Sequence, residues 1–192
     1  MISQEGRGTA TAIVAADRRV AVMESALVTF ARFGYRKTSM EEVARAARIS
    51  RPGLYFLFAS KEDLFRAAVS QALEDDVAEV QRILESDGPF RDRLLDSFDR
   101  WAGRYVGPLA RDVATVIDDN PDLLGDIVVS MPQRFANLLT NAIAAKTAMP
   151  DRETAVALAQ TMISVAVGIK HQVDDREAYR RRLAVAIDLL LR

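Results

Sequence analysis

The 192-residue sequence contains no cysteine and only one histidine. Without cysteine the chain forms no disulfide, no thiolate metal site and no cysteine nucleophile. No apolar run approaches the roughly 18 residues of a membrane-spanning helix. The first residues lack the basic segment and long apolar stretch of a signal peptide, so we expect none. Together these absences favour a cytoplasmic protein that crosses no membrane.

The sequence also lacks the residue patterns of common enzyme sites. It has no glycine-rich phosphate loop and no metal-ligand spacing. No serine-based or metal-binding group forms around the single histidine, His171, which is better interpreted as a buried or interfacial structural residue. We therefore expect a protein that is not an enzyme and holds no cofactor or metal.

The charges that are present are unevenly distributed. The net charge is −1, but residues 1–66 hold 11 Lys/Arg against 7 Asp/Glu and the remainder holds 15 against 20. A basic front on an acidic body is the expected charge pattern of a DNA-binding protein with a separate second domain. Chance asymmetry among solvated faces is the alternative explanation.

Apolar residues recur at helical spacing along the chain, and no alternating strand pattern or hairpin dipeptide interrupts them. Residues 1–16, with few large side chains, are expected to form a flexible arm. The predicted fold is all-α with about nine helices, and a kink or break is expected at Pro132. The helices are predicted at about 17–33, 38–47, two turns from Ser50, 60–85, 90–106, 108–118, 121–148, 151–173 and 176–191.

The ends of the early helices carry recognisable signals. Gly34 is placed where a helix needs a left-handed C-terminal cap. The next helix can begin at Thr38, with Glu41 closing a capping box, or one residue later at Ser39 with Glu42. Two boundaries therefore remain open for this helix.

Residues 38–64 contain two short helices joined by a tight turn at Arg48 and Ile49. This arrangement predicts a helix-turn-helix, whose second helix can enter the major groove of DNA. Ser50 caps that second helix, and Pro52 falls in its first turn, where a missing N–H is tolerated. Ser60, with Asp63 three residues later, caps the helix that follows.

A DNA-reading helix must present small polar and basic groups at its N-terminal end. Ser50, Arg51 and Gly53 supply them, and Arg51 can form two hydrogen bonds with one guanine. Tyr55 can hydrogen-bond a phosphate while its ring packs on the sugar. Lys61 is placed to hold the DNA backbone from the other side.

The segment GYRKTSMEEVARAARISRPGLYFLFASKEDL, residues 34–64, resembles the DNA-binding domain of the tetracycline-repressor (TetR) family. It departs from the family pattern at Arg48, where the turn usually has glycine, and at Leu57, where a polar residue or histidine is common. The first departure adds a positive charge beside the DNA, and the second removes a phosphate contact. The matching residues are Phe30, Gly34, Tyr35, Thr38, Val43, Ala44, Ser50, Pro52, Leu54, Tyr55, Phe58, Ser60, Lys61, Glu62 and Leu64.

The resemblance implies that Thr38 and Ser39 contact phosphate, while the start of the second helix faces base edges. Simple capping also explains Thr38 and Ser50, and a half-buried core position also explains Tyr55. Phe30, Phe33, Leu54 and Phe58 are expected in the core. The predicted DNA-binding residues are Thr38, Ser39, Arg48, Ser50, Arg51, Gly53, Tyr55 and Lys61.

Residues 17–64 are thus predicted to form the DNA-binding domain, and residues 65–192 an effector-binding and dimerisation domain. The resemblance implies a homodimer in which the last two helices form a four-helix bundle with their symmetry mates. The apolar residues of those helices could instead form only an intramolecular core. They are Ala155, Leu158, Ala159, Met162, Ile163, Ala166, Val167, Tyr179, Leu183, Ala186, Ile187, Leu190 and Leu191.

The second domain is also expected to hold a pocket for a small-molecule effector. Its predicted walls are Trp101, Tyr105, Met131, Phe135 and Met162, although ordinary core packing would also explain each of them. The predicted function is that of a DNA-binding transcriptional regulator, a repressor that an effector releases from a near-palindromic operator. The alternative is a helical ligand-binding or scaffold protein without a DNA function.

Overall fold

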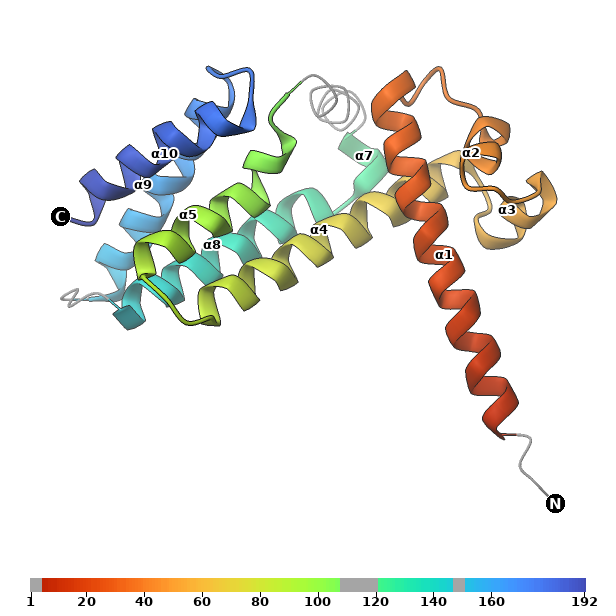
Figure 1. Cartoon of the computed structure of the whole chain (residues 1–192), viewed down its shortest axis with the longest axis horizontal. Helices are drawn as coiled ribbons and strands as arrows, with labels where there is room; N and C mark the ends of the chain where they lie inside the picture. The colour runs from red at the N-terminus through yellow and green to blue at the C-terminus, as the bar shows by residue number, and fades with distance from the viewer. Residues whose placement is uncertain (1–4, 108–120, 147–150) are drawn as a thin grey trace. The chain divides into compact units, whose positions relative to one another are not determined.

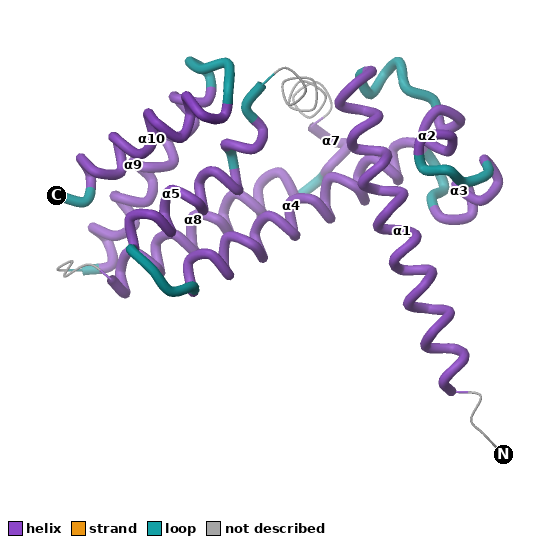
Figure 2. The backbone as a smooth tube through the Cα atoms, viewed as in Figure 1, coloured by secondary structure: helices purple, strands orange, loops and turns teal. Residues whose placement is uncertain are grey.

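The computed structural model describes residues 5–107, 121–146 and 151–192, and every regular element among them is helical (Figures 1 and 2). The all-α prediction is therefore confirmed for these residues. The chain divides into two compact units. Unit 1 runs to Gln71 and includes the short segment that ends at Leu124, whereas unit 2 starts at Ala72 and includes the chain from Gly125 onward. This division falls seven residues after the predicted boundary at residue 64.

Unit 1 contains α1 (Glu5–Phe33), α2 (Met40–Ala46), α3 (Arg51–Leu57), the start of α4 (Lys61–Glu85) and α7 (Pro121–Leu124). In Figure 1 the N-terminal half of α1 extends beyond α2 and α3. Residues 5–16, which were expected to form an arm, belong to this helix. Their many alanines favour a helix, but they lack the large apolar side chains that mark helical spacing in a sequence.

Three aromatic rings form the centre of unit 1. Phe30, Tyr35 and Phe65 pack together with ring centroids 4.9–5.5 Å apart. The turn that brings Tyr35 there needs Gly34, which adopts φ +80° and donates its N–H to the Phe30 carbonyl at 2.9 Å. This confirms the predicted left-handed cap. Phe33 was also expected in the core, but it is 51% exposed because no described element covers its side of the last turn of α1.

The two short helices of the predicted helix-turn-helix begin at side-chain caps. Ser39 and Glu42 form a complete capping box at the start of α2, so the later of the two possible starts is correct. Ser50 accepts a hydrogen bond from the Gly53 N–H at 3.1 Å at the start of α3. Between them Arg48 has φ +53°, the left-handed region that favours glycine.

Unit 2 contains the rest of α4, α5 (Phe90–Trp101), the short 3₁₀ helix η1 (Gly103–Tyr105), α8 (Ile127–Lys146), α9 (Arg152–Lys170) and α10 (Arg176–Leu190). The helix predicted at 90–106 is thus α5 followed by η1, and the one predicted at 108–118 lies outside the described residues. One continuous apolar core joins the helices of this unit. Its largest fully buried members are Leu94, Phe98, Phe135, Leu139, Ile143, Met162 and Tyr179.

A kink or a break was expected at Pro132, and the break is wrong, because this residue lies inside α8. Buried neighbours on the same helix, Met131 and Phe135, hold the segment helical despite the missing backbone N–H. The helix predicted at 121–148 is interrupted earlier, at Gly125, which has φ +59°. A glycine therefore ends α7, and α8 begins two residues later.

A buried carboxylate, Asp99, joins α5 to α10. Arg176 donates to both of its oxygens at 2.9 and 2.6 Å, and Arg180 donates to Oδ2 at 2.7 Å. Burial opposes the ionisation of Asp99, but these charged hydrogen bonds outweigh it and hold its pKa below the ordinary value. The ionised Asp99 carboxylate therefore holds α10 against α5 through two arginines.

A second buried carboxylate, Asp76, joins α4 to the end of α5 and to η1. Arg100 and Arg104 approach one of its oxygens at 2.7 and 2.6 Å, and the Tyr105 hydroxyl donates to the other at 2.6 Å. Here burial is the larger effect, so the pKa of Asp76 is raised despite both cations.

The left-handed turn leads to a first prediction. Arg48→Gly and Arg48→Ala both remove the charge, but only glycine adopts the turn without steric cost. We expect the glycine variant to be more stable than the alanine variant by about 0.5–1 kcal/mol, measured by urea unfolding. Equal stability of the two variants would contradict the backbone conformation at this residue.

A second prediction concerns Gly103, where α5 gives way to η1. A Cβ added there would overlap Asp99 Oδ1 and lie 2.9 Å from Cδ1 of Tyr179. Both neighbours are held in place, so Gly103→Ala should lower the free energy of unfolding by about 1–3 kcal/mol. Gly168→Ala is the matched control, because a Cβ at that position meets nothing within 4 Å. A Gly103→Ala protein as stable as the control would show that the packing here is looser.

Candidate nucleic-acid interface

The exposed side of α3 is fixed by what the helix buries. Leu54 and the C-cap residue Phe58 have almost no exposed surface. Arg19 of α1 holds the same end of α3, because it donates to the Leu57 carbonyl and lies 4.1 Å from the Phe58 ring centroid. The helix therefore has one orientation in unit 1, with Arg51 and its neighbours facing outward.

Most of the predicted DNA-binding residues lie together on the surface of α2, the turn and α3. Ser39, Arg48, Ser50, Arg51 and Tyr55 are all exposed, and Gly53 is half-buried against the Ser50 hydroxyl. The hydroxyls of both serines already serve as helix caps. Arg51 lies 5.8 Å from the Tyr55 ring centroid, so the two side chains share one flank of α3. Their contacts with DNA remain predictions.

Thr38 requires a correction. Its side chain is 1% exposed, and its hydroxyl donates to the Gly34 carbonyl at 2.8 Å. A hydroxyl enclosed in this way cannot reach a phosphate, nor does it cap α2, which begins one residue later. The role of Thr38 is to fix the turn between α1 and α2.

Lys61 is half-buried and directed toward the same turn. Its ammonium donates to the carbonyls of Tyr35 and Thr38 at 3.1 and 3.2 Å and lies 4.5 Å from the Tyr35 ring centroid. These contacts tie the start of α4 to the loop before α2. The lysine thus supports the loop from inside, and a further contact with the DNA backbone remains a prediction.

Three further cations were not singled out from the sequence. Arg36, Lys37 and Arg45 are exposed, and with Arg48 and Arg51 they form a group that we call the basic set. None of the five has an ion-pair partner among the described residues. The charge excess of residues 1–66 was the available signal. Seven arginines of unit 2 are instead paired with acids: Arg82 with Glu79, Arg91 with Asp188, Arg100 and Arg104 with Asp76, Arg176 and Arg180 with Asp99, and Arg181 with Glu177. Arg134, Arg152 and Arg182 bond to neutral groups.

Phe56 was also missed. It is 88% exposed and lies on α3 between Tyr55 and Leu57. A helix-turn-helix that only supports the fold has no need of an exposed phenylalanine there. The signal in the sequence was its position two residues after a core leucine, which places the two on different faces of a helix.

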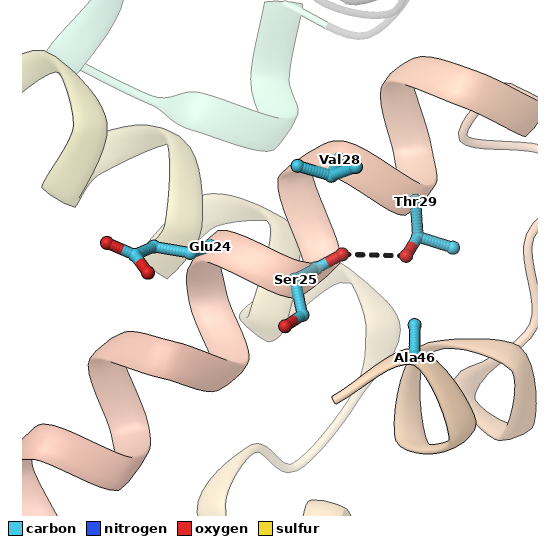
Figure 3. Close-up of a pocket in the computed structure, with 5 residues that line it drawn as sticks. All are labelled: Glu24, Ser25, Val28, Thr29 and Ala46. Carbon is cyan, nitrogen blue, oxygen red and sulfur yellow. Dashed lines mark hydrogen bonds between the residues drawn. The ribbon is translucent and has the colours of Figure 1, made fainter. Parts of the chain in front are cut away.

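A shallow hollow of about 290 Å³ lies between α1 and α2, and Figure 3 shows the side chains that line it. Glu24, Ser25, Val28, Thr29 and Ala46 line it. The two hydroxyls bond to carbonyls of their own helix, Ser25 to Ala21 at 2.9 Å and Thr29 to Ser25 at 2.6 Å. Because these donors are already used, we assign no ligand to the hollow.

The predicted effector-pocket residues lie in unit 2, where several form ordinary core. Trp101 stacks on Phe135 with ring centroids 4.8 Å apart, and Phe135 and Met162 are 1% exposed members of the same cluster. Tyr105 is bound to Asp76, and Met131 is buried on α8. Core packing therefore accounts for these side chains, and a role as pocket walls remains a prediction.

All but one of the apolar residues predicted for the dimer bundle are buried or half-buried within the chain. Tyr179, Leu183 and Ile187 of α10 are fully buried within the chain itself, as are Ala155, Ala159, Met162 and Ala166 of α9. They are intramolecular core. The exposed apolar residues on these helices are Val167, Val185 and Leu189, at 49–59% exposure. Of these, only Val167 was among the residues singled out from the sequence.

Other classes of site have little support in the structure. Among the described residues no cluster of three His, Cys, Asp or Glu side chains is arranged to hold a metal ion. No helix in the described ranges is both long and apolar enough to cross a membrane. His171, expected to be buried or interfacial, is an exposed residue at the C-cap of α9, so within the chain it is not buried.

Comparison with known proteins agrees with the geometry of unit 1. Residues 22–68 match the model of a family described as bacterial regulatory proteins, tetR family. The chain is 34% identical over 77 residues to YezE, an uncharacterized HTH-type transcriptional regulator of Bacillus subtilis, covering 40% of each chain. It is 33% identical over 72 residues to the HTH-type transcriptional regulator RutR of Escherichia coli, covering 38% of this chain and 34% of RutR. These matches span about two fifths or less of the curated relatives.

Solved structures extend the likeness of fold to nearly the whole chain. A tetR-family transcriptional regulator from Mesorhizobium loti has a TM-score of 0.72 at 18% identity, over 92% of this chain and 96% of that one. The reduced form of NemR from Escherichia coli has a TM-score of 0.73 at 16% identity, over 91% and 97%. Residues 22–68 thus match the tetR family of bacterial regulatory proteins, and the chain shares its fold with solved regulators of that family.

Proposed function

We propose that this chain is a transcriptional regulator that binds duplex DNA through α2, the turn and α3 of unit 1. The observation that carries the proposal is the basic set, five exposed cations on α2, on α3 and in the turns that precede them. None of them forms an ion pair within 4 Å among the described residues, although Arg45 interacts with Glu42 at longer range. By contrast, the buried carboxylates of unit 2, Asp76 and Asp99, hold two arginines each. Unpaired cations on one surface favour a polyanion as the partner.

Phosphate contacts by the basic set predict strong dependence on salt. Each neutralised phosphate releases condensed counterions, so the logarithm of affinity falls with the logarithm of salt concentration by about 0.9 per contact. If all five cations take part, the slope is roughly −4 to −5 for each DNA-binding head. A scaffold or ligand-binding protein without a DNA function would show no such dependence.

Arg51 is the residue that we assign to base recognition. It lies in the first turn of α3, it is exposed, and the Tyr55 ring beside it limits where its guanidinium can lie. A guanidinium presents two parallel donors that match the two acceptors of guanine in the major groove. Tyr55, on the same flank, is then placed to meet the sugar-phosphate backbone.

We further propose that two copies associate through α9 and α10. Val167, Val185 and Leu189 remain exposed after the core of unit 2 is complete, and an apolar surface of this kind is expected to be covered. A two-fold dimer would present two copies of α3 about one DNA turn apart, roughly 34 Å, and would bind a near-palindromic operator in the cytoplasm.

Regulation by a small molecule completes the proposal. An effector bound in unit 2 would release the dimer from DNA if it bound better to a state whose two heads are spaced wrongly for the operator. Repression follows from the resemblance to the family. Screening small molecules for release of the bound operator tests this part.

A third prediction tests DNA binding itself. Sequences that the protein selects from random duplex DNA should share a near-palindromic motif, and Arg51→Ala should weaken binding to it by about 1–3 kcal/mol while relaxing the preference at one position. Arg82→Ala is the control, since Arg82 is also an exposed arginine but lies in unit 2 and pairs with Glu79. Unchanged sequence preference in Arg51→Ala would refute the assignment, and absence of salt-dependent binding would refute the function.

A fourth prediction tests the dimer. Val185→Glu with Leu189→Glu places charges on the exposed apolar surface of α10 and should convert a dimer into a monomer in analytical ultracentrifugation. Val129→Glu is the control, because Val129 is even more exposed but lies on α8. If the double variant sediments like the wild type, the copies associate elsewhere or not at all.

A further inference from the structure

Phe56 is the most exposed of the large apolar residues in the described chain, at 88%. Single exposed apolar residues are common on protein surfaces. This one, however, lies on α3 within the basic set, where cations rather than apolar groups would be expected to dominate. Its position on α3 therefore has to be compared with that of the residues that α3 buries.

The helical repeat shows which way Phe56 points. Successive residues of a helix are separated by about 100°. Measured from the buried Leu54, Pro52 and Phe56 lie at about 160° and 200°, directly opposite the core, and both are exposed. Arg51 and Tyr55 lie at about 60° and 100°, on one flank. The outermost line of α3 is therefore apolar, and we call it the Pro52–Phe56 ridge.

We infer that the Pro52–Phe56 ridge contacts the C5-methyl groups of thymines on the floor of the major groove, with Phe56 as the principal contact. The inference rests on the proposed function, because it requires α3 to enter DNA. It adds a chemical class of recognition that the cations of the basic set cannot supply.

The chemistry of the ridge limits what it can recognise. Neither the phenylalanine ring nor the proline ring has a group that hydrogen-bonds a base edge or a phosphate. The only apolar group on a base edge in the major groove is the thymine methyl, and phenylalanine is one of the side chains suited to it. The surrounding basic set favours duplex DNA as the occupant over an apolar protein surface, since it would leave five charges facing that protein.

Recognition of two different bases by one helix predicts the composition of the operator. Polar recognition of guanine by Arg51 and apolar recognition of thymine by Phe56 come from adjacent turns of one short helix. Each half-site should therefore contain a thymine close to the guanine, and the preference for that thymine should depend on its methyl group rather than on its base pairing.

The test uses the selected operator with single thymines replaced by uracil, which removes the methyl and leaves pairing unchanged. Full-length wild-type protein should lose about fourfold in affinity at one or two positions in each half-site, as burial of one methyl group implies. Phe56→Ala should bind the normal operator more weakly and should no longer distinguish thymine from uracil at those positions. Phe56→Leu should retain part of the discrimination.

Phe33→Ala is the matched control, because it removes another exposed phenylalanine of unit 1, on α1. This variant should keep the full discrimination against uracil. Circular dichroism on every variant separates loss of recognition from loss of folding.

Four outcomes would overturn the inference. The wild type could bind its operator with the same affinity whether thymine or uracil is present, or Phe56→Ala could discriminate as well as the wild type. In either case the ridge does not recognise methyl groups, while the proposed function as a regulator remains valid. If Phe56→Ala binds DNA normally but self-associates less, the ridge contacts protein. If no duplex is bound with sequence preference, the proposed function fails and the inference fails with it.

Discussion

The burial of Leu54 and Phe58 is the constraint on which the rest of the interface depends. Because these two side chains fill the core of unit 1, α3 cannot rotate, and its opposite face must point to solvent. Arg19 secures the same end of the helix from α1. The turn at Arg48 then keeps α2 against α3, at the cost of a left-handed residue that is not glycine. Core packing thus determines which residues a partner can meet.

The two units use charge in opposite ways. In unit 2 buried carboxylates collect arginines from neighbouring helices, so that Asp99 joins α5 to α10 and Asp76 joins α4 to η1. In unit 1 the exposed cations around α3 remain unpaired among the described residues. In unit 2 the paired charges join neighbouring helices, whereas the exposed cations of unit 1 are the ones that we propose meet DNA. This contrast agrees with the sequence, in which residues 1–66 have an excess of basic residues and the remainder an excess of acidic ones.

Sequence reasoning succeeded where local chemistry decides the structure. Gly34, Ser50 and Ser60 act as the predicted caps, because a cap depends only on residues a few positions away. It failed where burial depends on distant elements. Thr38 and Phe33 are neighbours of correctly predicted positions, yet the first is enclosed and the second exposed, because the packing of other helices decides both.

Burial by distant elements also decides the role of the apolar residues on α10. Helical spacing alone places Tyr179, Leu183 and Ile187 on one stripe of α10, but it cannot say whether that stripe packs within the chain or against a second copy. In the structure the stripe is internal, and the exposed Val185 and Leu189 lie beside it. Phe56 was missed for a related reason, since an apolar residue within a predicted helix is normally assigned to the core.

Side-chain footprinting with hydroxyl radicals, with and without the selected operator, tests most directly the central claim that the exposed face of α3 contacts DNA. The account predicts that operator DNA lowers the oxidation rates of Tyr55 and Phe56 and leaves that of Phe33 unchanged, whereas unchanged rates at Tyr55 and Phe56 would contradict it.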